Sequence, residues 1–97
     1  MSYRIFVTSE AELDALESAI WYNEQSDGLG AKFLEALDIE IVYIKSNPEL
    51  FAVKYKETRV AHVKRFPYGI HYIIETERIV ILAILHTSRN PQLWKDR

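Results

Sequence analysis

The sequence predicts an α+β fold in which a helical hairpin packs on a small antiparallel sheet, in the order β-α-α-β-β-β. Two patterns predict it. Between residues 9 and 47, apolar residues recur every three or four positions, as on one face of a helix. From residue 58 onward they alternate or run together, as they do in strands. A chain of 97 residues is the size of one domain with one core, so we expect a single domain over residues 1–97.

The first predicted strand runs directly into the first predicted helix. Residues 3–8, "YRIFVT", are few and rich in β-forming residues, which predicts a strand. Ser9 follows as a candidate N-cap, and Glu12 completes the pattern of a capping box. The helix is expected to end at the turn formed by residues 26–30, "SDGLG". Its apolar stripe, the usual packing face of a surface helix, consists of Leu13, Leu16, Ile20 and Trp21.

The second helix is predicted between this turn and Asn47. Its apolar stripe consists of Leu29, Phe33, Leu34, Leu37, Ile41 and Ile44. Residues 38–44, "DIEIVYI", alternate locally and contain β-branched residues, so they would also suit a strand. The helical period sustained from residue 29 to residue 44 favours a helix, and Pro48 supplies its stop.

Three strands are predicted after the helices. Residues 58–65 alternate, residues 66–69, "FPYG", suit a tight turn, and residues 70–75 run back. After a second turn, residues 79–86, "IVILAILH", are almost wholly apolar. This pattern indicates a central strand that is buried on both faces.

Composition excludes several classes of function. The chain has no cysteine, which rules out disulfides and thiolate metal sites, and its three histidines lack metal-binding spacing. We therefore expect no metal and no cofactor. The first 20 residues lack the apolar run of a secretory signal, and no stretch approaches the roughly 20 apolar residues that span a bilayer. A cytoplasmic protein without membrane contact is expected.

The net charge of −2 conceals an asymmetry between the two halves of the chain. Residues 1–50 hold three basic and ten acidic residues, whereas residues 51–97 hold nine basic and four acidic residues. The basic half is therefore where an acidic or anionic partner is expected. An acidic chain has the wrong overall sign for binding a phosphate backbone, so nucleic-acid contact would need a local patch.

One stretch of the basic half resembles a known family. Residues 64–68 read Lys-Arg-Phe-Pro-Tyr, an apolar strand follows, and His86, Arg89, Pro91 and Trp94 come next. This order resembles the RelE/ParE superfamily of toxins from bacterial type II toxin-antitoxin systems, and within it the ParE-like branch. Residues 33–51 are similar to the second helix and following turn of that branch, which favours helix for residues 38–44.

The resemblance implies a small toxin that is neutralised by a cognate antitoxin, whose tail wraps along the helical hairpin and the sheet. ParE-like members inhibit DNA gyrase by binding, which makes gyrase the expected target. RelE-like members instead cut messenger RNA on the ribosome, so an endoribonuclease is the alternative. A degenerate relative that binds antitoxin without being toxic is a second alternative.

A metal-free ribonuclease needs a base, an acid and cations held together. RelE-like relatives place an arginine just after the hairpin turn, where this chain has Gly69. If the chain were a ribonuclease, its catalytic residues would be His86, Arg89 and Lys64. Because that set is incomplete, we favour binding over catalysis. His86 is then expected to bond locally, to a carbonyl of the segment holding Pro91.

The candidate partner-binding residues lie on the predicted strands, their turn and the segment after the last strand. Tyr68 is expected to be the exposed turn aromatic, whereas Trp21 and Tyr22 are expected to pack between hairpin and sheet. Trp94 is expected to close an edge of the core. The candidates are Arg59, Lys64, Arg65, Tyr68, Arg89 and Trp94.

Overall fold

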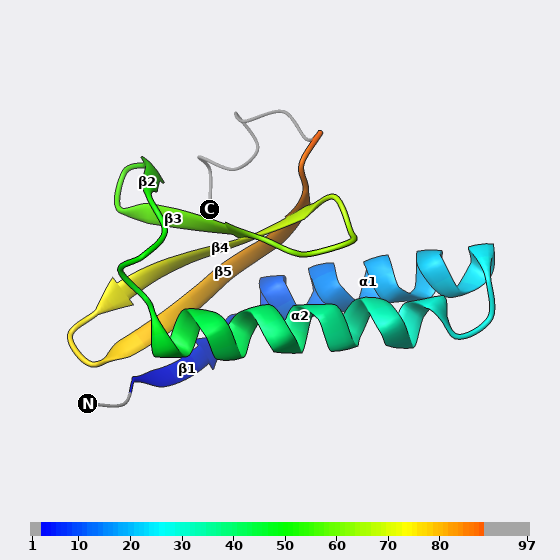
Figure 1. The fold of residues 1–97 in the computed structure, drawn as a ribbon, viewed down its shortest axis with the longest axis horizontal. Coiled ribbons are helices and arrows are strands. Elements are labelled where there is room, and N and C mark those ends of the chain that lie inside the picture. The colour runs from blue at the N-terminus through cyan, green and yellow to red at the C-terminus, as the bar shows by residue number, and fades with distance from the viewer. Residues whose placement is uncertain (1–2, 89–97) are drawn as a thin grey trace.

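The computed structural model describes residues 3–88, which form two helices packed on one side of a five-stranded sheet (Figure 1). The strands are β1 (Arg4–Val7), β2 (Val53–Tyr55), β3 (Thr58–His62), β4 (Tyr68–Glu75) and β5 (Arg78–His86). The helices α1 (Ser9–Gln25) and α2 (Leu29–Ser46) form the predicted hairpin. The predicted fold class is confirmed, including helix for residues 38–44.

The sheet differs from the prediction in two respects. Its strand order is β1-β5-β4-β3-β2, and β2 is a short edge strand that the sequence did not reveal. β1 pairs with β5 in parallel, with Arg4 opposite Arg78 and Val7 opposite Ile81, so the sheet is mixed. The remaining pairs are antiparallel, and β5 is the predicted central strand with most of its residues buried.

The start of α1 is capped by Thr8 rather than Ser9. The Thr8 hydroxyl accepts a hydrogen bond from the Ala11 N–H at 3.1 Å and donates to the Leu82 carbonyl at 3.3 Å. Ser9 is already the first helical residue, so the predicted capping box with Glu12 does not form. The cap thus fixes the start of α1 against β5.

The face of α1 that packs on the sheet is also not the predicted one. Ala11 and Ala19 are buried, and Ala15 and Tyr22 pack partly against the core. The large residues predicted as the packing stripe point outward: Leu13, Leu16, Ile20 and Trp21 are all more than half exposed. Small residues on the inner face let the backbone approach the sheet and α2 closely.

The hairpin itself depends on such a close approach. Gly30, in the first turn of α2, faces α1 so closely that a Cβ atom there would lie 2.4 Å from the Ala19 carbonyl oxygen. The stripe of α2 behaves as predicted, with Phe33, Leu37 and Ile44 buried in the core. The hairpin turn and the β3–β4 turn lie at the same end of the molecule (Figure 1).

Candidate functional site

The β3–β4 turn carries two of the basic residues that the sequence singled out. Lys64 and Arg65 are exposed, and Arg65 has a φ of +73°, in the left-handed region that glycine usually occupies. The Val63 N–H donates to the Tyr68 carbonyl at 2.9 Å, and the Tyr68 N–H donates to the Phe66 carbonyl at 2.7 Å. This turn starts earlier than predicted, because β3 ends at His62 rather than at residue 65.

A groove of about 790 Å³, hereafter the α2 groove, lies between this turn and α2. Its apolar lining includes Ala36 and Ile39 of α2 and Phe66 and Pro67 of the turn. Its charged lining is mixed in sign and consists of Lys32, Glu35, Glu40, Lys64 and Arg65. The turn cations thus face a surface that offers both apolar and ionic contacts.

Glu40 is the unusual member of this lining because it is buried. It is 6% exposed, and within residues 3–88 no hydrogen-bond donor or cation contacts its carboxylate. Buried carboxylates are ordinarily bonded, since removing an unpaired charge from water is costly. The sequence did not reveal this residue, which reads as one more acid in the middle of a helix.

An aromatic cluster supports the wall of the α2 groove. Tyr22, Phe33 and Phe66 have ring centroids 5.0 to 5.2 Å apart, and Tyr68 lies 4.8 Å from Phe33. Tyr68, expected at the exposed turn, is half-buried in this cluster at the first position of β4. Burial, and then the neighbouring Tyr68, raise the pKa of Tyr22. Tyr22 packs as predicted, whereas Trp21 is 54% exposed.

Arg59 has a different place from the turn cations. Its Nη1 donates to the Phe51 carbonyl at 2.6 Å and to the Glu49 carbonyl at 3.2 Å, which ties the segment after α2 to β3. Nearby, the buried Tyr72 hydroxyl donates to the Pro48 carbonyl at 2.7 Å. Burial raises the pKa of Tyr72 to about 12, although the charge of Arg59 lowers it. Arg59 therefore stabilises the packing of the segment after α2 against β3.

At the tip of β5, the described contacts of the His86 side chain are made with Ser88 and Tyr68, whereas the segment holding Pro91, which was expected to supply a carbonyl, lies outside the described residues. Its Nδ1 accepts the Ser88 N–H at 3.1 Å and lies 2.7 Å from the Ser88 hydroxyl. The Tyr68 ring lies 5.3 Å away on the neighbouring strand. Because Nδ1 accepts a backbone hydrogen bond, the neutral ring carries its proton on Nε2. His86 thus makes a local hydrogen bond, to Ser88.

Gly69 lies where RelE-like relatives place an arginine, and the space beside it is filled. A Cβ atom on Gly69 would lie 2.8 Å from Cγ1 of Val60 on β3. Any side chain there would displace Val60, which is buried. The described part of the chain therefore has no room for an arginine at this position.

The outward side of the helical hairpin forms a second candidate surface. Leu13, Leu16 and Ile20 are 55 to 60% exposed and share one face of α1, because they are spaced by three and four residues. Ile39 and Val42 of α2 are 61 and 65% exposed. These five residues are hereafter called the outer face, and the three of α1 lie on the side of that helix away from its buried Ala11 and Ala19.

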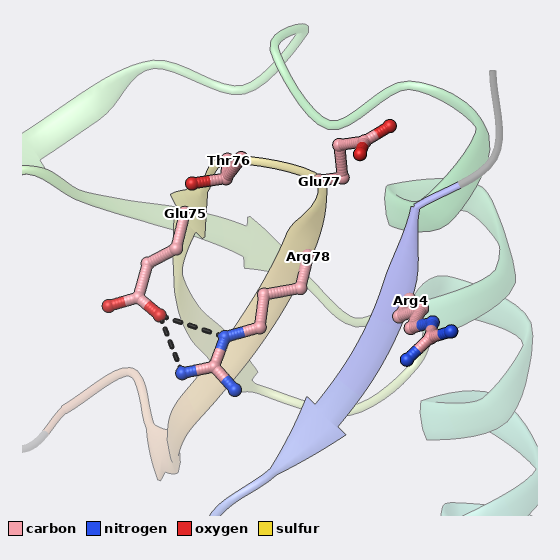
Figure 2. Close-up of a pocket in the computed structure, with 5 residues that line it drawn as sticks. All are labelled: Arg4, Glu75, Thr76, Glu77 and Arg78. Atoms are coloured by element: carbon pink, nitrogen blue, oxygen red, sulfur yellow. Dashed lines mark hydrogen bonds and ion pairs between the residues drawn. The ribbon is translucent and has the colours of Figure 1, made fainter.

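A shallow hollow of about 840 Å³ lies at the far end of the sheet, beside the β4–β5 turn (Figure 2). Arg78 donates from Nε and Nη2 to one carboxylate oxygen of Glu75, at 2.9 and 2.8 Å, and lies over the Phe6 ring at 5.3 Å. Both side chains of this pair are about half exposed, so the pair contributes little to stability. Among residues 3–88, the basic side chains that line it are Arg4 and Arg78.

Two further expectations concern metals and membranes. Within residues 3–88, no group of three or more histidine, aspartate and glutamate side chains is arranged to hold a metal ion. Neither α1 nor α2 is long and apolar enough to cross a membrane. Arg89, Pro91 and Trp94, which the sequence singled out, lie outside the residues that the structure describes.

Comparison with known proteins defines the class to which this fold belongs. The architecture matches a solved structure described as "Chromosomal ParDE TA system from P. aeruginosa", with a TM-score of 0.70 and 17% identity over 89% of this chain and 97% of that chain. At that identity the likeness shows a shared fold. Residues 3–91 match the model of the family described as "ParE toxin of type II toxin-antitoxin system, parDE", so the chain belongs to the ParE toxin family. No curated protein matches the sequence.

Proposed function

We propose that this ParE-family toxin inhibits DNA gyrase by binding it, and that a cognate antitoxin neutralises it by covering the outer face of the hairpin. The outer face is the observation that carries the antitoxin half of this proposal. An isolated exposed leucine is ordinary on a protein surface, but five large, exposed apolar residues on two helices that pack against each other are typical of an interaction site.

The proposed antitoxin contact follows from the spacing on the outer face. An amphipathic segment with apolar residues at intervals of three and four would match Leu13, Leu16 and Ile20. Since each of these side chains is already partly buried, completing its burial contributes on the order of 1 kcal/mol. Five such residues contribute about 5 kcal/mol, which only matches the lower end of the roughly 4 to 15 kcal/mol that association costs, so a stable complex needs further contacts beyond the outer face.

Binding rather than RNA cleavage is supported by the strand tips. Gly69 has no space for the arginine of RelE-like relatives, which would supply a cation for cleavage. Because Nδ1 of His86 is bonded to Ser88, general acid-base catalysis would fall to Nε2, and it would also need the cation that is missing at Gly69. Gyrase as the target rests on membership of the ParE family.

The experiment pairs purified toxin with purified gyrase and with the antitoxin encoded beside it. Wild-type toxin should block supercoiling, and antitoxin should restore it. Leu16→Glu should leave the toxin folded and weaken antitoxin binding by about 100-fold, because a carboxylate would be buried against apolar residues. Leu50→Glu is the matched control, since Leu50 is 63% exposed and lies outside the outer face. Equal effects of the two substitutions would contradict the assignment of this surface.

A further inference from the structure

The α2 groove contains an ionic feature that the outer face lacks. Glu40 lines the groove, is 6% exposed, and receives no hydrogen bond or ion pair from residues 3–88. The buried Tyr72 hydroxyl does not donate to it, because that hydroxyl donates to the Pro48 carbonyl. An unpaired carboxylate lowers the stability of the free domain unless a cation is brought to it.

The groove's own cations do not neutralise Glu40. Lys32 lies on α2, and Lys64 and Arg65 lie on the facing turn. All three are exposed, and none approaches the carboxylate within 4.0 Å, the limit for an ion pair. The left-handed backbone of Arg65 belongs to a turn that two backbone hydrogen bonds close. Within residues 3–88, one wall of the groove therefore has a buried carboxylate without a cation, and the facing turn has two cations without an ion-pair partner.

Charge complementarity defines what fits this groove. A peptide segment with an arginine or lysine aimed at Glu40 would supply the missing cation, and an acidic residue beside it would meet Lys64 or Arg65. The apolar walls formed by Ala36, Phe66 and Pro67 suit the aliphatic stem of such a cation.

The outer face and the α2 groove are continuous at one residue. Ile39 is 61% exposed on the outer face and also lines the groove. A tail that crosses the outer face therefore reaches the groove without leaving the surface of α2. We propose that the antitoxin tail continues from the outer face into the α2 groove and places a cationic side chain against Glu40. This inference rests on the proposed antitoxin binding.

The test measures the Kd of a synthetic peptide of the antitoxin tail for four toxins: wild type, Glu40→Gln, Glu35→Gln and Leu16→Glu. Glu40→Gln keeps the shape of the side chain and removes its charge. It should weaken binding about 10- to 100-fold, whereas Glu35→Gln, an exposed glutamate on the same groove, should change the Kd by less than about threefold. Each arginine and lysine of the peptide is then replaced by methionine. One replacement should have a large effect on wild type and almost none on Glu40→Gln.

Thermal unfolding of the free toxins separates this role from a structural one. Because the buried carboxylate of Glu40 has no partner on the described chain, Glu40→Gln should leave the Tm unchanged or raise it. A lowered Tm would overturn the inference, since the carboxylate would then stabilise the free fold.

The remaining outcomes distinguish the two proposals. If the peptide binds wild type and Glu40→Gln equally well, while Leu16→Glu binds weakly, the groove inference fails and the outer-face assignment survives. If the peptide does not bind wild type, antitoxin binding itself fails, and the groove inference fails with it. If Glu40→Gln instead dissociates a dimer of the toxin in sedimentation experiments, the occupant is a second copy and the antitoxin assignment is wrong.

Discussion

Replacing Gly30 with alanine tests the close contact that sets the two helices side by side. A Cβ atom built on Gly30 would lie 2.4 Å from the Ala19 carbonyl oxygen and 3.2 Å from the Cβ of Asn23. Ordinary carbon-oxygen contacts begin at about 3.3 Å, so the helix backbones would have to separate by roughly 1 Å. The carbonyl belongs to a helix backbone and cannot rotate away as a flexible side chain could.

The expected change in the free energy of unfolding is the difference between two opposing effects. Overpacking costs about 1 to 3 kcal/mol, and the higher helix propensity of alanine offsets up to about 1 kcal/mol of it. We expect Gly30→Ala to lower the free energy of unfolding by about 1 to 2 kcal/mol, or roughly 5 to 15 °C in Tm. Urea and thermal unfolding followed by circular dichroism measure both quantities.

Gly28 provides the matched control. It has a φ of +85° and no atom within 4 Å of a built Cβ, so only its backbone conformation matters. Asparagine tolerates that conformation, and Gly28→Asn should change the free energy of unfolding by less than about 0.5 kcal/mol. If Gly30→Ala were as stable as wild type, the hairpin could widen without cost and the packing argument for the position of the outer face would be wrong.

Three other substitutions have definite expected outcomes. Thr8→Ala removes the cap that accepts the Ala11 N–H and should lower the free energy of unfolding by about 1 to 2 kcal/mol, whereas Thr8→Ser should retain most of it in urea unfolding. Tyr72→Phe leaves the buried Pro48 carbonyl without its donor and should cost about 1 to 3 kcal/mol. Because the folded pKa of Tyr72 is raised from 10.0 to about 12, its stabilising contribution is full below pH 10 and is lost as the pH rises toward 12. Alkaline unfolding should therefore be shallower in Tyr72→Phe, and an unchanged profile would refute the assignment. His86→Ala should leave gyrase inhibition and growth arrest within about threefold of wild type, whereas an RNA-cleaving toxin would lose its activity.

Much of the fold could be predicted because its signals are local. The period of α2 placed Phe33, Leu37 and Ile44 in the core, and the apolar run after residue 78 marked the central strand β5. The parallel pairing of β1 with β5 joins residues more than 70 positions apart, and no local pattern reports it. β2 was missed because three residues at a sheet edge carry too little alternation to be recognised.

The face of α1 shows why periodicity alone could mislead. Two stripes run along this helix, one of large apolar residues and one of small residues that includes Ala11 and Ala19. Hydrophobicity alone favours the large residues as the packing face. Packing favours the second, because the Ala19 backbone must approach Gly30 closely. The leucines that periodicity assigned to the core are therefore exposed, and they form part of the outer face on which the proposed antitoxin contact rests.

The candidate site was predictable in part. The adjacent basic pair Lys64 and Arg65 and the turn that carries it are local sequence features, and the structure places both on the surface. Glu40 could not be singled out, because its burial depends on a turn more than 20 residues away in the chain. Arg59 resembled the turn cations in sequence, yet its guanidinium binds backbone carbonyls.

The most direct test of the central claim is pulse labelling of DNA and protein synthesis in bacteria during the first minutes after the toxin is induced without antitoxin. A toxin that binds gyrase should stop DNA synthesis first, while protein synthesis continues. Early collapse of protein synthesis with DNA synthesis intact would contradict a gyrase-binding toxin and would return His86 and the strand tips to consideration as a ribonuclease site.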